Sequence, residues 1–237
     1  MNDQIASSVA KLDWVTLQQS LDEYGYAKLP RLLSPTVCTD LMVGYGNELA
    51  FRNTIDMARY RFGIGEYKYY DAPLPYPIQQ LRESIYPELS KAANRYLELS
   101  GQTADYPASL AAFVEQCQQK GQTRSTPLIL KYEAGGYNCL HQDLYGDIFF
   151  PFQVVFALNQ RDTDYTGGEF LLMEQRPRAQ SRGSVITLDQ GEGLIFPTRH
   201  RIVPGTRGYY RTTLRHGVST VTSGTRFSLG IIFHDAK

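Results

Sequence analysis

The chain has 237 residues, of which 42% are hydrophobic and 20% are charged, and its 24 basic residues balance 24 acidic ones. This length and composition exclude a collagen-like or largely disordered chain, and they suit a single domain over residues 1–237 with a full hydrophobic core. No run of 18 apolar residues occurs, so we expect no membrane span and no membrane partner. The first residues lack the pattern of a secretion signal.

The three cysteines, Cys38, Cys117 and Cys139, are odd in number and widely spaced. This spacing argues against a disulfide framework and against a structural zinc site. We therefore expect a reducing compartment, the cytoplasm.

Residues 1–125 are expected to be mainly helical, after a short strand within residues 24–33. Ser34 followed by Pro35 is typical of a helix N-terminus, and the sequence predicts a helix from there through Leu49.

Two further helices are expected in this half. Residues 77–99 carry apolar side chains at helical spacing, although Pro87 should kink or divide that helix. Residues 107–122 form the next predicted helix, which ends at Gly121.

Residues 57–77 contain many tyrosines, glycines and prolines in no periodic pattern. We interpret them as a long structured loop. It either packs on the surface or forms a lid whose aromatic side chains, Tyr67 and Tyr69 among them, stack on a planar substrate.

From residue 126 onward, short runs rich in Val, Ile, Phe, Tyr and Leu alternate with glycine-containing turns. Seven or more strands at this spacing predict an all-β sandwich or barrel over residues 126–237. With the helices before it, the chain is expected to have an α+β fold. No glycine-rich phosphate-binding loop is present.

His141 and Asp143 are separated by one residue, in "CLHQDLYGD". On a strand, side chains at i and i+2 point to the same face, so both can reach one metal ion. A second histidine from a distant strand would complete a 2-His-1-carboxylate triad, the usual site of non-haem Fe(II) oxygenases. The triplet by itself decides nothing, because 4 histidines and 24 acidic residues in 237 positions give roughly 0.4 such triplets by chance.

His200 and His216 both qualify as the third ligand. Arg226 follows His216 by ten residues, in what we interpret as a hairpin with its turn at residues 222–225. That hairpin would place Arg226 beside the His216 strand, where an arginine can bind a dicarboxylate, with Ser228 on the same face. His200 is followed by "VPGTRGYY", which is typical of an inserted loop, so we favour His216.

Charge is unevenly distributed, because residues 176–215 contain eight arginines and two acidic residues, a local charge of +6. These arginines either form a solvated rim or attract an anionic partner.

The pieces His141-x-Asp143, "GGEFLLME", "GEGLIFP", "RHGV" and "SGTRFSLGIIF", in this order, resemble the Fe(II)/2-oxoglutarate-dependent dioxygenases. The resemblance implies a double-stranded β-helix core, of the jelly-roll or cupin-like kind, with the N-terminal helices packed on it. "GQTRSTPLILKYEAGGYNCLHQDLYGD" and "LGIIFHDA" are similar to a bacterial family predicted to demethylate damaged nucleic acids oxidatively, by kinship with AlkB-type enzymes.

The resemblance also implies the cofactors and their residues. His141, Asp143 and His216 would hold Fe(II), with O2 as oxidant, and the far carboxylate of 2-oxoglutarate would meet Arg226 and Ser228. Tyr132 resembles a tyrosine that steadies this co-substrate in related hydroxylases. Asn138 and Asn159 are further candidate donors near the metal.

The leading hypothesis is a dioxygenase that hydroxylates or demethylates an alkylated base in a single strand or flipped from a duplex. Tyr145, Asp147 and Arg211 are further candidate substrate contacts. One alternative keeps the chemistry but acts on a protein side chain, as prolyl hydroxylases do, or on a small metabolite. Another is a cupin-like metal-binding sensor without turnover, which would have no use for Arg226.

Overall fold

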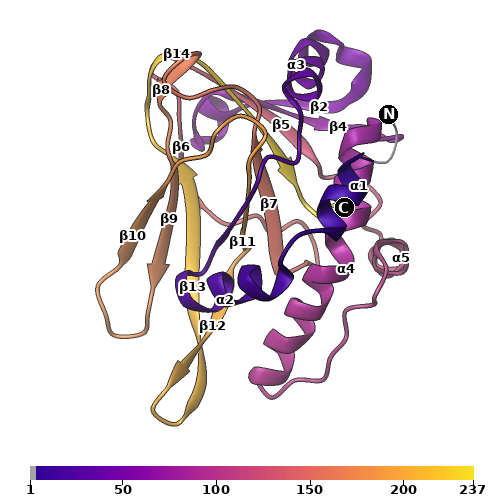
Figure 1. Cartoon of the computed structure of the whole chain (residues 1–237), viewed down its shortest axis with the longest axis vertical. Coiled ribbons are helices and arrows are strands. Elements are labelled where there is room, and N and C mark those ends of the chain that lie inside the picture. The colour runs from indigo at the N-terminus through magenta and orange to yellow at the C-terminus, as the bar shows by residue number, and fades with distance from the viewer. Residues whose placement is uncertain (1–3) are drawn as a thin grey trace.

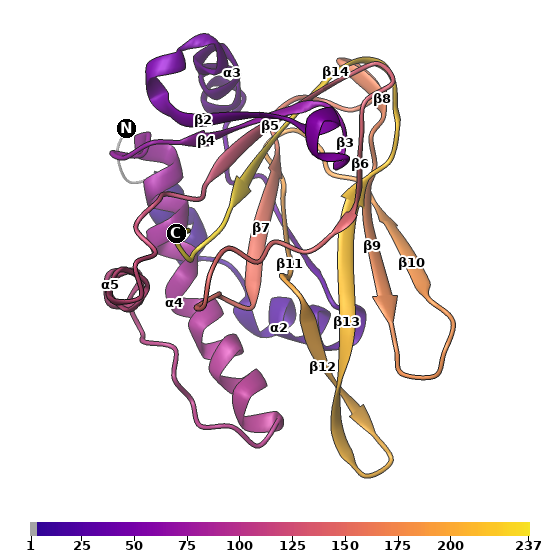
Figure 2. The same ribbon diagram turned by 180° about the vertical axis from the view of Figure 1, so that it is seen from behind.

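The computed structural model describes residues 4–237. Two antiparallel β-sheets face each other, and helices cover the outer side of the larger sheet (Figures 1 and 2). This arrangement confirms the predicted α+β class with a double-stranded β-helix core. No helix within residues 4–237 is both long and apolar enough to cross a membrane.

The helical elements lie before the main run of strands. They are α1 (Gln4–Ala10), α2 (Trp14–Tyr24), α3 (Pro35–Val43), α4 (Tyr76–Leu99) and α5 (Leu110–Gln119), with short 3-10 turns η1 (Gly44–Gly46), η2 (Glu48–Ala50) and η3 (Met57–Tyr60).

The larger sheet has the strand order β1-β11-β7-β14-β5-β4-β2, with β8 paired to β14. Its strands are β1 (Ala27–Leu29), β2 (Phe51–Asp56), β4 (Glu66–Tyr70), β5 (Leu128–Glu133), β7 (Phe152–Ala157), β8 (Tyr165–Gly167), β11 (Gly193–Pro197) and β14 (Val221–Ile231).

The smaller sheet has the order β10-β9-β13-β6-β3, with β12 paired to β13. Its strands are β3 (Gly63–Ile64), β6 (Tyr137–His141), β9 (Phe170–Gln175), β10 (Arg182–Ile186), β12 (His200–Gly205) and β13 (Gly208–Val218). The β9–β10 and β12–β13 hairpins extend beyond the body of the molecule (Figures 1 and 2).

Strand β7, "FQVVFA", shows how the sequence produces these layers. All six residues are buried, because the strand has a covered face on each side. Phe152, Val154 and Phe156 belong to the core shared with the helices. Val155 and Ala157 belong to the core between the two sheets. A continuous apolar run is therefore required here.

Two of the helix predictions need correction. Helix α3 has the predicted Ser34 cap, whose Oγ accepts a hydrogen bond from Val37 N, but it ends at Val43 rather than Leu49. Gly44 and Gly46 follow, and glycine disfavours continued helix, so the chain enters 3-10 turns instead.

Pro87 was predicted to kink or divide helix α4, and the helix is not divided there. The missing N–H of a proline costs about 3 kcal/mol in a helix interior. The stripe of Ile78, Leu81, Ile85 and Leu89 is buried against the core on both sides of Pro87. This packing keeps the helix continuous.

Residues 57–77 are not the long loop that we expected. They contain η3, β3 and β4, and β4 joins the larger sheet with Tyr67 opposite Leu130 of β5. The tyrosines of "EYKYY" favour an extended chain, and pairing with β5 stabilises that chain as a strand of the sheet.

The predicted pairing of the His216 and Arg226 strands is also wrong. β13 and β14 lie in different sheets, and the chain crosses between them at residues 219–220 rather than turning at 222–225. "VPGTRGYY" likewise is no inserted loop, because it forms the end of the β12–β13 hairpin.

Candidate functional site

Strands β6 and β13 bring together the three residues of the predicted triad. His216 is the register partner of His141, and Asp143 follows β6 by two residues. Asp143 Oδ2 lies 3.2 Å from His216 Nε2, and Asp143 Oδ1 lies 3.5 Å from His141 Nε2. One ligand atom from each residue falls within 4.8 Å of the others. These two imidazoles and one carboxylate can hold a metal ion.

The orientation of His141 is fixed by its second nitrogen. His141 Nδ1 lies 2.7 Å from the carbonyl oxygen of Cys139, so Nδ1 carries the proton. This contact directs Nε2 at Asp143, which is the arrangement that metal-binding histidines use.

The electrostatics of the other two residues suit metal binding. Burial lowers the pKa of His216, and the neighbouring His141 lowers it further. Burial alone would raise the pKa of Asp143, but its hydrogen bond to His216 and the charges of both histidines outweigh this and hold that pKa well below its usual range. At neutral pH the site therefore offers a neutral imidazole and a carboxylate, the protonation states that a metal requires.

Aromatic rings hold His216 in place from behind. The Phe170 ring stacks on the His216 imidazole at a centroid distance of 5.8 Å and an angle of 12°. Phe196 contacts the same ring at 4.8 Å. Both phenylalanines also line the cavity next to the triad.

Asp143 has a further partner in Tyr145, whose hydroxyl donates a 2.7 Å hydrogen bond to Oδ1. The Tyr145 ring meets Tyr69 edge-on at 6.2 Å, and Tyr69 meets Tyr67 in the same way at 5.4 Å. The Arg52 guanidinium lies 4.4 Å from the Tyr69 ring. A row of aromatic side chains thus extends from the triad to β2.

The triad opens into a cavity of about 320 Å³ between the two sheets. Arg226 of β14 reaches this cavity from the opposite sheet and is 4% exposed. Its Nη1 donates to Ser228 Oγ at 3.0 Å, and its Nε has no hydrogen-bond partner. Its charge influences Glu169, but within residues 4–237 no carboxylate lies within ion-pair distance of it.

A buried cation without a counter-charge is costly, and a bound carboxylate would remove that cost. Tyr132 and Asn138 complete the wall around Arg226: the guanidinium carbon lies 5.6 Å from the Tyr132 ring, and Asn138 Nδ2 donates to the Tyr132 hydroxyl at 3.3 Å. This wall fits the far carboxylate of 2-oxoglutarate, and the triad fits Fe(II).

Gly168 explains part of the "GGEF" motif. It has φ +63°, and a Cβ built there would lie 2.7 Å from Arg226 Cδ. The absence of a side chain therefore leaves the space that the Arg226 side chain occupies.

The structure brings some of the other candidate residues to the cavity. Tyr67, Tyr145, Tyr132 and Asn138 line it. Tyr69 lies behind Tyr145, outside the cavity lining.

The remaining candidates lie elsewhere. Asp147 is exposed and forms an ion pair with Lys237 at 2.8 Å, and Arg211 donates to Gln102 Oε1 at 2.7 Å. Asn159 is buried and bridges Thr225 O and Phe227 N, so it steadies β14 instead of facing the metal site. None of these three lines the cavity.

The competing histidine, His200, lies on β12 and does not line the cavity. Its register partner is Thr213, whereas His216 is the partner of His141. The choice of His216 over His200 therefore agrees with the geometry.

Several cavity residues were missed by sequence reasoning, among them Arg61, Phe62, Gln153, Phe170 and Phe196. Phe170 lies on β9, where burial alternates along the strand, so a period-2 reading of "GEFLLME" could have placed it on the inner face. "GLIFP" is apolar and buried throughout, so it marks Phe196 as buried without indicating which face it occupies. Arg61 and Phe62 carry no such signal, because their position depends on how η3 and β3 pack.

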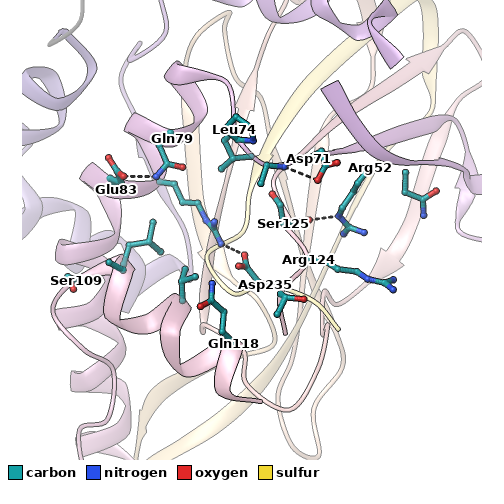
Figure 3. A pocket seen from close by; sticks show the side chains of 18 of the residues that line it. Arg52, Asp71, Leu74, Gln79, Glu83, Ser109, Gln118, Arg124, Ser125 and Asp235 are labelled. Atoms are coloured by element: carbon teal, nitrogen blue, oxygen red, sulfur yellow. Dashed lines mark hydrogen bonds and ion pairs between the residues drawn. The ribbon is translucent and has the colours of Figure 1, made fainter. Parts of the chain in front are cut away.

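A larger cleft of about 1090 Å³ lies elsewhere, between α4, α5 and the start of β5 (Figure 3). Its buried charges, Arg82 and Asp235, pair with each other at 2.6 Å, and the half-buried Arg52 donates to the Ser125 carbonyl at 2.7 Å. No residue of the triad lines this cleft.

A facing pair of antiparallel sheets that holds such a triad near one end defines a class of protein, the non-haem Fe(II) oxygenases that use 2-oxoglutarate and O2. A comparison with family models is more specific. The family Oxygenase-NA, described as an oxygenase catalysing oxidative methylation of damaged DNA, matches residues 65–236. The protein belongs to this family and is a 2-oxoglutarate-dependent oxygenase.

The chain is also similar to an uncharacterized protein of Mycobacterium tuberculosis, found in two strains. The two sequences are 50% identical over 167 residues, which is 70% of this chain and 72% of the relative.

Solved structures share the fold at low sequence identity. A prolyl hydroxylase from Trichoplax adhaerens, in complex with a hypoxia inducible factor peptide fragment, has a TM-score of 0.60 at 14% identity and covers 99% of this chain and 94% of its own. A Pseudomonas putida prolyl-4-hydroxylase has a TM-score of 0.52 at 15% identity, with 94% and 99% covered.

Proposed function

We propose that this oxygenase removes methyl groups oxidatively from alkylated bases of a nucleic acid. Fe(II) would be held by His141, Asp143 and His216, and 2-oxoglutarate by Arg226 and Ser228. The observation that carries the site assignment is Arg226, a buried cation that lines the same cavity as the triad and has no carboxylate partner among residues 4–237.

The residues of the chain have distinct parts in this proposal. Arg226 and Ser228 orient the co-substrate, while Tyr132 closes the cavity beside them. Phe170 and Phe196 exclude water behind His216. Electrostatic interactions within the site are therefore less screened than they would be in water.

Bound Fe(II) and 2-oxoglutarate supply the oxidation: O2 is consumed, 2-oxoglutarate becomes succinate and CO2, and one oxygen atom enters a C–H bond of the substrate. At an N–CH3 group the product is N–CH2OH, which breaks its C–N bond to give formaldehyde and the free base. Neither reactant carries a methyl group for transfer, so we propose removal of a methyl group rather than its addition.

Two observations support a nucleic-acid substrate. The family description names damaged DNA. The arginine-rich region supplies charge, because seven of its eight arginines are exposed while Arg201 is buried and pairs with Glu174. Exposed arginines attract a phosphate backbone.

The experiment incubates the purified protein with Fe(II), 2-oxoglutarate and an N-methylated oligonucleotide. We expect succinate, formaldehyde and the unmethylated base in equal amounts, the last identified by mass spectrometry. A proline-containing peptide and a panel of small metabolites serve as alternative substrates. Succinate formed with the peptide or a metabolite, but not with the oligonucleotide, would contradict the nucleic-acid proposal.

The site assignment has its own variants. Arg226→Ala should raise the KM for 2-oxoglutarate by about 100-fold or more and keep bound iron, because a buried charge pair is lost. Arg31→Ala removes an exposed arginine outside the cavity and is the matched control. Equal KM values in the two variants would refute the role of Arg226.

A further inference from the structure

Residues 57–64, which we call the rim segment, border the cavity and are firmly attached. Met57 is fully buried, and Phe62 N donates to Met57 O at 3.0 Å. Cys139 N donates to Phe62 O at 2.7 Å, and β3 pairs with β6 immediately before the triad. The rim segment is therefore held against the strand that carries His141.

This attached segment nevertheless exposes two aromatic rings. Tyr60 is 54% and Phe62 is 45% exposed, and the rings stack on each other at 5.5 Å with an angle of 20°. Phe62 also lines the metal cavity. The ring pair thus forms an apolar surface that begins in the cavity and ends in solvent.

Two arginines flank these rings. Arg59 and Arg61 are exposed, and neither has an ion-pair partner within residues 4–237. Arg61 has φ +59°, a left-handed conformation that an arginine adopts only at a cost, and it lines the cavity beside Phe62. Exposed aromatic rings interleaved with unpaired arginines are the pattern of a single-strand binding surface.

We propose that the rim segment is the platform on which an unpaired base stacks as it enters the cavity, with Arg59 and Arg61 binding the phosphates on either side. This inference rests on the proposed function and specifies its substrate as single-stranded nucleic acid. A planar base extends the Tyr60–Phe62 stack by one ring. A proline ring of a peptide can contact the aromatic surface but leaves both guanidinium groups without anions.

The test measures binding of a fluorescently labelled, N-methylated single strand by anisotropy, beside the same sequence as a duplex. Wild type binds the single strand more tightly than the duplex, which must first unpair the base. Tyr60→Ala and Phe62→Ala each weaken single-strand binding by about 10-fold or more. Leu49→Ala, which removes an even more exposed apolar side chain outside the cavity lining, retains wild-type affinity.

Salt titrations separate the arginines from the rings. Arg59→Ala and Arg61→Ala each reduce the slope of log K against log salt by about 0.7, the value for one phosphate contact on a single strand. The two aromatic variants weaken binding without changing this slope. Thermal melting of every variant checks that it is folded.

A second reporter is available because Trp14 is the single tryptophan of the chain. In a Trp14→Phe background, Phe62→Trp places the indole at the cavity, and its fluorescence is quenched when a base stacks on it. An unquenched indole with saturating single strand would overturn the platform.

The outcomes distinguish this inference from the function on which it rests. If wild type demethylates the oligonucleotide and the rim variants bind it as tightly as wild type, the platform is refuted and the proposed function stands. If wild type forms succinate only with a peptide, and the rim variants abolish that reaction, both the proposed function and the base platform are refuted.

Discussion

The proposed metal ligands His141 and His216 are both oriented by neighbouring groups. The Cys139 carbonyl fixes the tautomer of His141, while two phenylalanine rings fix the plane of His216. A triad supported in this way requires little rearrangement when a metal binds.

His216→Ala should abolish stoichiometric iron binding, because only two protein ligands, His141 and Asp143, would remain to hold the ion. His200→Ala should keep a full complement of iron, since His200 lies on β12 outside the cavity. Metal content after dialysis, measured by atomic absorption, gives the answer. Iron loss in the His200 variant would show that the wrong histidine has been assigned.

Tyr145→Phe removes the hydroxyl that donates to Asp143 Oδ1 and keeps the ring. Loss of such a supporting hydrogen bond lowers metal affinity by about 10- to 100-fold. The affinity for Co(II), used as a coloured probe in place of Fe(II), can be measured by competition with a chelator and read from the absorbance of the bound ion. The matched control is Tyr60→Phe, because Tyr60 is 54% exposed and does not line the cavity. Equal affinities in both variants would refute the role of Tyr145.

At the scale of elements, some glycine turns allow two backbone segments to approach more closely than a side chain would permit. Gly191 precedes β11 with φ +81°, and its carbonyl accepts hydrogen bonds from Leu32 N and Leu33 N. A Cβ there would lie 2.1 Å from the Leu33 carbonyl oxygen. This turn therefore attaches the segment before α3 to the larger sheet.

Gly191→Ala should destabilise the protein by about 3 kcal/mol or more, because steric overlap with backbone adds to the left-handed strain. Gly121→Ala is the control, since Gly121 has φ +74° but no atom within 4 Å of its built Cβ. Its cost should be about 1 to 2 kcal/mol, from strain alone. Urea denaturation compares the two, and equal costs would contradict the steric argument.

Much of the β half could be predicted from its sequence, because buried strands leave a direct pattern. "FQVVFA" and "GLIFP" are continuous apolar runs, and their strands are buried throughout. The His141-x-Asp143 spacing predicted that the two side chains meet, and they do, although Asp143 lies two residues beyond the end of β6 and not on the strand itself.

The pairing of strands is not local, and there the predictions were wrong. A ten-residue interval suggested that His216 and Arg226 lie on one hairpin, whereas the chain crosses to the opposite sheet between them. Both arrangements bring Arg226 near the triad, so the spacing alone could not distinguish them. Pro87 and residues 57–77 were misjudged for a related reason, because packing partners far along the chain overrode local preference.

At the scale of the whole molecule, stability should depend on pH through His234. This histidine is 1% exposed, its Nδ1 accepts from Phe150 N at 3.2 Å, and its Nε2 has no partner. Burial lowers the pKa of His234 to about 4 from its ordinary 6.5. The unfolded chain therefore binds a proton at a higher pH than the folded protein does.

The stability that neutral His234 contributes is complete above about pH 6.5 and is lost as the pH falls towards 4, in total about 3 kcal/mol. Urea midpoints at pH 7.5 and pH 5 should differ strongly in wild type. His234→Asn keeps an acceptor for Phe150 N but cannot take up a proton, so its midpoints should differ less. An equally steep dependence in this variant would exclude His234 as the cause.

The unpaired charge of Arg226 also has a thermodynamic consequence. Because the folded chain alone offers a site for the dicarboxylate, 2-oxoglutarate should stabilise the native state by about 2.7 kcal/mol at 100 times its dissociation constant. The melting temperature should then rise with co-substrate concentration in wild type, whereas Arg226→Ala should need about 100 times more co-substrate for the same rise. The thermal stability of this protein would therefore depend on the concentration of 2-oxoglutarate around it.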